Sequence, residues 1–146
     1  MTVTWNEKSI PTVQELESPA VSVTVVSIRA ELLSLAVSTA KQLTLGLRAQ
    51  LEVLAPYAVP FPLDLYHPPV APSFLEDKLL SDKALLSDVQ QARILLCRDE
   101  GDAIVDTLAP NALVVMATKK RWWRTKEESL AARLRKAGYQ VVLAYT

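Results

Sequence analysis

Apolar residues follow two alternating patterns along the chain. Short runs rich in valine, isoleucine and leucine are typical of strands that are buried on both faces of a sheet. Between them lie longer segments in which apolar residues recur every three or four positions, as they do on one side of a helix. The predicted strands span 20–28, 51–56, 92–97, 111–118 and 139–146. The predicted helices span 29–50, 73–91, 99–110 and 125–138.

Several predicted helix ends carry the residues that such ends prefer. Ser73 and Glu76 have the spacing of a capping box, and so do Thr125 and Glu128 before the last helix. Gly138 follows that helix, and glycine commonly terminates helices. The first helix is predicted from an apolar stripe at helical spacing, formed by Leu32, Ala36, Ala40, Leu43 and Leu47.

Strict alternation of strands and helices predicts a single α/β domain over residues 20–146. We expect a doubly wound, five-stranded parallel sheet of order 3-2-1-4-5 with helices on both faces. In this arrangement the order of strands reverses between the first and fourth strands, which are neighbours in the sheet. Ligands bind beyond the carboxyl ends of the strands at such a point. We call this position the mouth. The segments "SIRAE" and "ATKKRWW" follow the two strands and flank it.

Two segments fall outside the alternation. Residues 1–19 show no sustained period, and we predict a tail or surface arm. Residues 56–72 contain six of the nine prolines, a density that forbids a helix or a central strand. We expect a stiff loop that caps the sheet edge, because its large apolar side chains favour burial. Alternatively, "YHPPVAP" within it is a ligand for a proline-recognising domain.

Composition and charge exclude several classes of protein. Sixteen basic residues balance sixteen acidic ones, which argues against a dedicated nucleic-acid-binding domain. Because no apolar run could span a bilayer and no signal peptide is evident, we expect a cytoplasmic protein without a membrane partner. Cys97 ends an apolar run, which indicates a buried thiol. The only histidine, His67, lacks partners at metal-ligand spacing, so we expect neither a metal site nor a catalytic residue.

Two common sites of α/β proteins are incomplete in this chain. A receiver domain needs acidic residues after its first strand to hold magnesium, and here Arg29 follows that strand. A dinucleotide or P-loop site needs glycines where the backbone approaches phosphate. The three glycines are Gly46, Gly101 and Gly138, and none follows the first or fourth strand.

The order of elements, the strand "NALVVMAT", the loop and helix after it, and the closing strand "YQVVLAYT" resemble a universal stress protein domain over about residues 20–146. The resemblance implies this fold and a role in the stress response. In nucleotide-binding members the fourth strand leads into a glycine-rich phosphate motif. Its positions fall on Ala117, Lys120, Leu130 and Ala131 here, so the resemblance predicts a degenerate site in which ATP or AMP binds weakly or not at all.

The segment 119–126, which we call the basic loop, is the main candidate for binding. Its cations could attract phosphate at the N-terminus of the last helix, or they could form a solvated surface. The residues that could contact phosphate or a nucleotide are Ser27, Arg29, Thr118, Lys119, Lys120, Arg121 and Arg124, with Lys126 close by.

Trp122 and Trp123 lie in the middle of the basic loop. They could stack on a base or a partner. We expect instead that one of them is buried across the mouth, where it would exclude an adenosine, and that the other is partly exposed.

The last strand is expected at a sheet edge and carries no charged side chain. Open edges recruit other strands. Universal stress proteins, which this chain resembles, dimerise through the corresponding strand. We therefore predict a homodimer around Val141, Leu143 and Tyr145. The leading hypothesis is a non-catalytic regulatory protein that acts through dimerisation or an unknown protein partner. The alternatives are a phosphate-ligand or nucleotide binder that uses the basic loop, and a nucleic-acid binder that uses its arginine, lysine and tryptophan residues.

Overall fold

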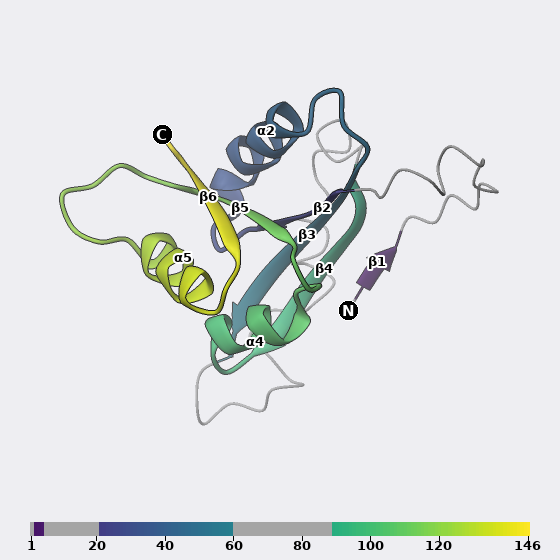
Figure 1. Cartoon of the computed structure of the whole chain (residues 1–146). Coiled ribbons are helices and arrows are strands. Elements are labelled where there is room, and N and C mark those ends of the chain that lie inside the picture. The colour runs from purple at the N-terminus through teal and green to yellow at the C-terminus, as the bar shows by residue number, and fades with distance from the viewer. Residues whose placement is uncertain (1, 5–20, 60–88) are drawn as a thin grey trace.

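The computed structural model describes residues 2–4, 21–59 and 89–146, which form a six-stranded sheet flanked by helices (Figure 1). The order of strands is β1-β4-β3-β2-β5-β6. The strands are β1 (Thr2–Thr4), β2 (Val21–Val26), β3 (Ala49–Ala58), β4 (Val89–Cys97), β5 (Leu113–Thr118) and β6 (Gln140–Tyr145). The helices are the 3₁₀ helix η1 (Ala30–Leu32) and the α-helices α2 (Leu33–Leu43), α4 (Glu100–Thr107) and α5 (Lys126–Lys136).

The predicted parallel sheet is confirmed. Strands β2 to β6 are the five predicted strands, and all of them pair in parallel in the order 3-2-1-4-5. β1 adds a sixth strand that runs antiparallel to β4, with Thr2 opposite Arg93 and Thr4 opposite Gln91. The start of the predicted N-terminal arm therefore extends the sheet, and three residues are too few to show a strand period in the sequence. Residues 5–20 of the arm lie outside the described part.

Helices cover both faces of the sheet and create two separate cores (Figure 1). α2 packs on one face, while α4 and α5 pack on the other. Successive residues of a strand point to opposite faces, so Val25 joins the core beneath α2 and Val26 joins the core beneath α4 and α5. Strands with buried side chains on both faces are the result, as the sequence predicted.

The first helix is shorter than predicted. α2 ends at Leu43, and the last two residues of the predicted stripe, Leu43 and Leu47, are 45% and 59% exposed. Gly46 adopts a positive φ of 79°, which turns the chain back toward β3, and Ala49 already belongs to that strand. Apolar spacing alone cannot show where such a turn ends a helix.

Two boundaries beside the proline-rich segment also differ from the prediction. β3 continues through Pro56 to Ala58. Ser27 donates its N–H to the carbonyl of Leu54, so Leu54 directs its backbone hydrogen-bonding groups toward β2. Pro56, two residues further along the strand, has the same orientation. Because β2 ends at Val26, the missing N–H of Pro56 costs no strand hydrogen bond. The rest of the predicted loop lies outside the described residues.

β4 begins at Val89 and not at the predicted residue 92. The last residues of the helix predicted over 73–91 are therefore strand. Residues 73–88 lie outside the described part of the chain, and so does the capping box predicted there.

Arg133 forms two of the ion pairs that join α4 to α5. Arg133 of α5 forms ion pairs with Asp102 and, at 2.8 Å, with Asp99, the N-cap of α4. The Asp102 N–H and then the Arg133 guanidinium lower the pKa of Asp99, which keeps this cap charged. The Arg133 side chain crosses the first turn of α4 at Gly101, where a Cβ atom would overlap the guanidinium.

We predict that the effect of Gly101→Ala depends on Arg133. In an Arg133→Ala background, Gly101→Ala should raise the free energy of unfolding by about 0.5 kcal/mol, because alanine favours the helix more than glycine does. In the wild type that gain should be offset, because the guanidinium must leave Asp99 and Asp102. Urea unfolding of the four proteins measures both effects, and equal effects in the two backgrounds would contradict the contact.

Candidate functional site

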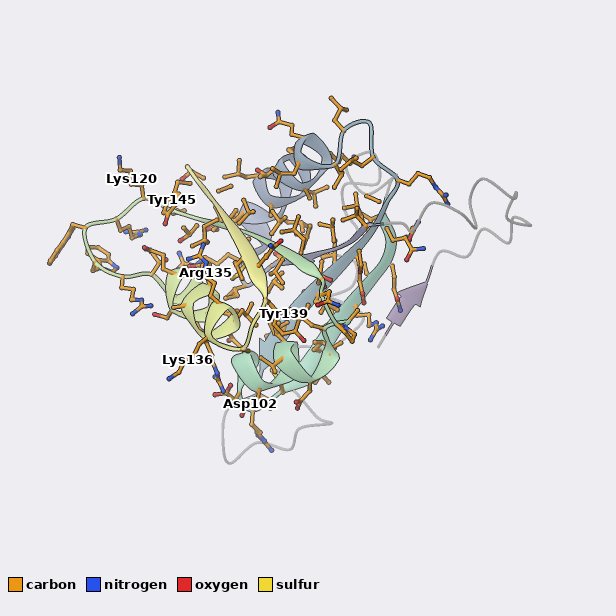
Figure 2. All side chains as sticks on the ribbon, viewed as in Figure 1. Asp102, Lys120, Arg135, Lys136, Tyr139 and Tyr145 are labelled. Atoms are coloured by element: carbon orange, nitrogen blue, oxygen red, sulfur yellow. The ribbon has the colours of Figure 1, made fainter. Side chains whose placement is uncertain are left out.

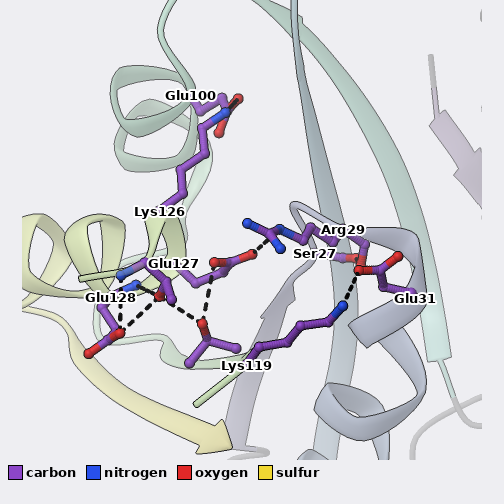
Figure 3. Close-up of polar contacts among 10 residues, drawn as sticks. Ser27, Arg29, Glu31, Glu100, Lys119, Lys126, Glu127 and Glu128 are labelled. Carbon is purple, nitrogen blue, oxygen red and sulfur yellow. Dashed lines mark hydrogen bonds and ion pairs between the residues drawn. The ribbon is translucent and has the colours of Figure 1, made fainter. Parts of the chain in front are cut away.

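Parallel topology brings the two predicted flanks of the mouth together. β2 and β5 are neighbours in the sheet, the chain leaves them toward opposite sides, and their carboxyl ends lie at the same edge. Ser27 and Arg29 follow β2, while Thr118 and Lys119 lie at the end of β5. These predicted residues therefore do gather at the mouth, together with the N-terminus of α5 (Figure 3).

A buried carboxylate occupies the mouth. Glu127, in the first turn of α5, is only 2% exposed. Its Oε1 atom lies 3.0 Å from Nε of Arg29, and its Oε2 atom accepts a hydrogen bond of 3.3 Å from the hydroxyl of Thr118 (Figure 3). The angles at Oε1 do not suit a directed hydrogen bond, so Arg29 acts on it mainly as a countercharge.

Two threonines close the base of the basic loop. The hydroxyls of Thr118 and Thr125 are 2.7 Å apart, and both residues are buried. The predicted capping box is confirmed: the Thr125 hydroxyl accepts from the N–H of Glu128, and the Glu128 carboxylate accepts from the N–H of Thr125. The strand end, the loop base and the helix start are therefore held by one polar network.

A second ion pair crosses the mouth nearer the solvent. Nζ of Lys119 lies 3.1 Å from Oε1 of Glu31, which belongs to η1 (Figure 3). At the other end of the loop, Lys126 pairs with Glu100 at 2.8 Å. Ser27 donates its hydroxyl to the carbonyl of Arg29 at 3.2 Å. Four of the predicted phosphate contacts, namely Ser27, Arg29, Thr118 and Lys119, are thus engaged within the chain.

The other three predicted contacts, Lys120, Arg121 and Arg124, are exposed to solvent. None of them forms an ion pair with any residue that the structure describes. They lie on the part of the basic loop beyond the threonine pair. We call residues 120–124 the loop tip.

The prediction that a tryptophan is buried across the mouth is wrong. Trp122 is 91% exposed and Trp123 is 47% exposed. Their rings meet edge to face with centroids 5.1 Å apart, and the guanidinium of Arg121 lies 5.2 Å from the ring centroid of Trp123. The mouth is already filled by Glu127 and Arg29, and the threonine pair keeps the loop tip outside it.

The positions that would carry the phosphate motif of universal stress proteins serve other purposes here. Ala117 packs in the core beneath α2, whereas Leu130 and Ala131 pack in the core beneath α4 and α5. Lys120 is exposed at the loop tip. At Ala117, Leu130 and Ala131 the backbone therefore carries side chains that pack in the two cores.

Sequence reasoning missed Glu127 as a site residue. An acid in the first turn of a helix is common because it interacts favourably with the helix dipole, so its burial against Arg29 left no separate sequence signal. It also missed a hollow of about 360 Å³ beside the mouth, at the start of α4. The hollow is lined by Ala58, Arg98, Asp99, Glu100, Gly101, Lys126, Ser129, Leu130 and Arg133.

Cys97 is buried at the end of β4, as predicted, and its thiol lies 3.6 Å from the carbonyl of Tyr57. Burial, followed by the charges of Glu100 and Asp99, raises the pKa of Cys97. The thiol therefore stays protonated at neutral pH, and a protonated thiol is a poor nucleophile.

No group of three histidine, cysteine, aspartate or glutamate side chains that could hold a metal ion occurs among the described residues. His67 lies outside them. Across the same parts of the chain, no helix is both long and apolar enough to cross a membrane.

Comparison with known proteins gave no match: no protein-family model, curated protein sequence or solved structure is significantly similar to this chain.

We predict that Arg29 and Glu127 are energetically coupled. Arg29→Met should lower the free energy of unfolding by about 2 kcal/mol, because it leaves a buried carboxylate without its countercharge. Glu127→Gln should cost less, about 1 kcal/mol, since the partly exposed Arg29 can be hydrated. The double variant should lose clearly less than the two single variants together.

Urea unfolding measures this cycle. The matched control is the exposed pair Lys119–Glu31, whose cycle of Lys119→Met and Glu31→Gln should show a coupling below about 1 kcal/mol. Additive losses at Arg29 and Glu127 would mean that the pair does not stabilise the mouth.

Proposed function

We propose that this chain is a non-catalytic binding protein, similar to universal stress proteins, whose nucleotide site is degenerate. It acts through association with a second copy or with another protein. The single observation that carries the proposal is the buried carboxylate of Glu127 at the start of α5.

The start of α5 opposes nucleotide binding in two ways. A phosphate at the N-terminus of α5 would need free backbone N–H groups and a positive potential. Here the N–H of Glu128 bonds to the Thr125 hydroxyl, and the Glu127 carboxylate brings negative charge to the same turn. Arg29, which lies at the mouth and could otherwise attract a phosphate, is already paired with Glu127.

An alternative is a phosphate-ligand binder that uses the basic loop. The exposure of Lys120, Arg121 and Arg124 supports this alternative, because unpaired cations attract anions. Such binding would be electrostatic and would not place phosphate against the backbone at the mouth. It would therefore depend strongly on salt and discriminate little between anions.

The exposed edge of the sheet supports association. β6 lies at the end of the strand order and pairs only with β5 among the described strands. Val141 is 8% exposed and belongs to the core of its own copy, so its contribution to a dimer would come from its backbone groups. Leu143 is half-buried, and Tyr145 is 51% exposed and available for contact.

We predict that ATP does not bind measurably at the mouth. Calorimetry at low salt should give a Kd of about 1 mM or weaker, because the mouth holds a carboxylate where a phosphate would need to lie. Glu127→Gln should strengthen the binding of ATP, since it removes that charge and releases Arg29.

Two further variants separate the proposals. If the basic loop binds phosphate, Lys119→Ala with Lys120→Ala should abolish micromolar ATP binding, while the exposed Lys136→Ala on α5 should not change it. Micromolar binding that requires Lys119 and Lys120 would replace the degenerate-site proposal with the phosphate-ligand one.

We predict a two-fold dimer through β6. Sedimentation of the wild type at micromolar concentration should show a dimer, and Leu143→Lys should shift it to a monomer because like charges then meet at the paired edges. Lys136→Ala is the control, with no expected change. A wild-type monomer at these concentrations would count against association through this edge.

A further inference from the structure

The loop tip carries the only cations of the basic loop that have no carboxylate partner among the described residues. Lys119 and Lys126, at the two ends of the loop, pair with Glu31 and Glu100. Three positive charges therefore remain within five residues of the chain, on Lys120, Arg121 and Arg124. A patch of this kind attracts an anionic surface at short range.

Two large aromatic rings are exposed among these cations. Trp122 is 91% exposed and Trp123 is 47% exposed. Tryptophan has an apolar ring and one N–H donor, and it is enriched at membrane–water interfaces, where the ring lies at the level of the lipid headgroups.

The loop is built to hold this tip away from the protein. Its base is closed by the buried hydroxyl pair of Thr118 and Thr125, and Lys119 is held by Glu31. Figure 1 shows the connection between β5 and α5 extending outward from the sheet and helices. Figure 2 shows Lys120 at the margin of the molecule with its side chain directed away from it. A held base lowers the entropy lost when the tip binds.

Carboxylates lie at the base of the loop, so an anionic partner is attracted by the tip and not by the base. Glu31 and Glu100 pair with the lysines at the two ends of the loop, and Glu128 caps the start of α5. Single-stranded nucleic acid is bound along a charged groove that follows several phosphates, and the net charge of this chain is zero. A flat anionic surface, in contrast, can bind through contact with the tip alone.

We infer that the loop tip is a peripheral membrane-binding element for anionic bilayers. Trp122 and Trp123 enter the headgroup region, while Lys120, Arg121 and Arg124 contact lipid phosphates. The prediction of no membrane partner was based on the lack of a spanning segment, which does not bear on contact at the surface. The inference goes beyond the proposed function and is independent of whether ATP binds at the mouth.

Vesicle sedimentation tests the inference directly. The wild type should bind phosphatidylcholine vesicles that contain about 30% phosphatidylglycerol and should bind pure phosphatidylcholine much more weakly. Raising the salt from about 0.05 M to about 0.5 M should release it. In a Trp5→Phe background, the tryptophan emission should shift to shorter wavelength with the anionic vesicles only.

Variants assign the binding to the tip. Lys120→Ala should lower the partition coefficient about fivefold, whereas the control Lys136→Ala, a cation exposed on α5 (Figure 2), should leave it unchanged. Replacing Lys120, Arg121 and Arg124 together by alanine should lower it about a hundredfold. Trp122→Ala with Trp123→Ala should remove most of the binding while leaving the melting temperature unchanged, because both rings are exposed.

Three outcomes would overturn the inference. The first is no binding to anionic vesicles at low salt, and the second is binding that the tip variants leave intact. The third is binding of a single-stranded oligonucleotide that the tip variants abolish, together with no binding to vesicles. That last result would assign the tip to nucleic acid.

Discussion

The position of α5 depends on the interactions of one buried charged side chain, that of Glu127. Glu127 is almost fully buried, and a buried carboxylate is costly unless an opposite charge and hydrogen-bond donors accompany it. Arg29 after β2 supplies the charge, and Thr118 at the end of β5 supplies a donor. The segment after β2, which is distant in the sequence, must therefore meet the end of β5 and the start of α5 at one place. Their meeting closes the mouth and also fixes the base of the basic loop through Thr118 and Thr125.

The parallel sheet was predictable because its causes are local and repeated. Valine-rich strands with apolar side chains on both faces must be covered on both sides, and right-handed crossovers then leave few possible orders. The end of α2 was not predictable in this way. Leu43 and Leu47 continue the helical spacing, but Gly46 turns the chain and leaves both exposed. Periodicity records which residues are apolar, whereas the end of a helix depends on the backbone at one position.

The candidate site was predicted in part for a similar reason. Topology alone places the residues after β2 and β5 side by side, so Arg29 and Lys119 were expected together. The partner of Arg29 could not be predicted, because Glu127 resembles any acid in the first turn of a helix. One of the two tryptophans was expected to be buried across the mouth, where a ligand would otherwise lie, and the other to be partly exposed. That expectation assumed a vacant mouth, and the ion pair between Arg29 and Glu127 occupies it.

The closed mouth and the exposed tip follow from one distribution of charge. Every basic residue that reaches the mouth or the two ends of the basic loop has an acidic partner: Arg29 pairs with Glu127, Lys119 with Glu31 and Lys126 with Glu100. Pairing largely cancels their attraction for an anion that approaches from a distance. The uncancelled charge is left at the tip, beyond the threonine pair and beside the two exposed tryptophans. An anion that approaches this side of the protein therefore meets its strongest attraction at the tip and not at the edge of the sheet where this fold usually binds its ligands.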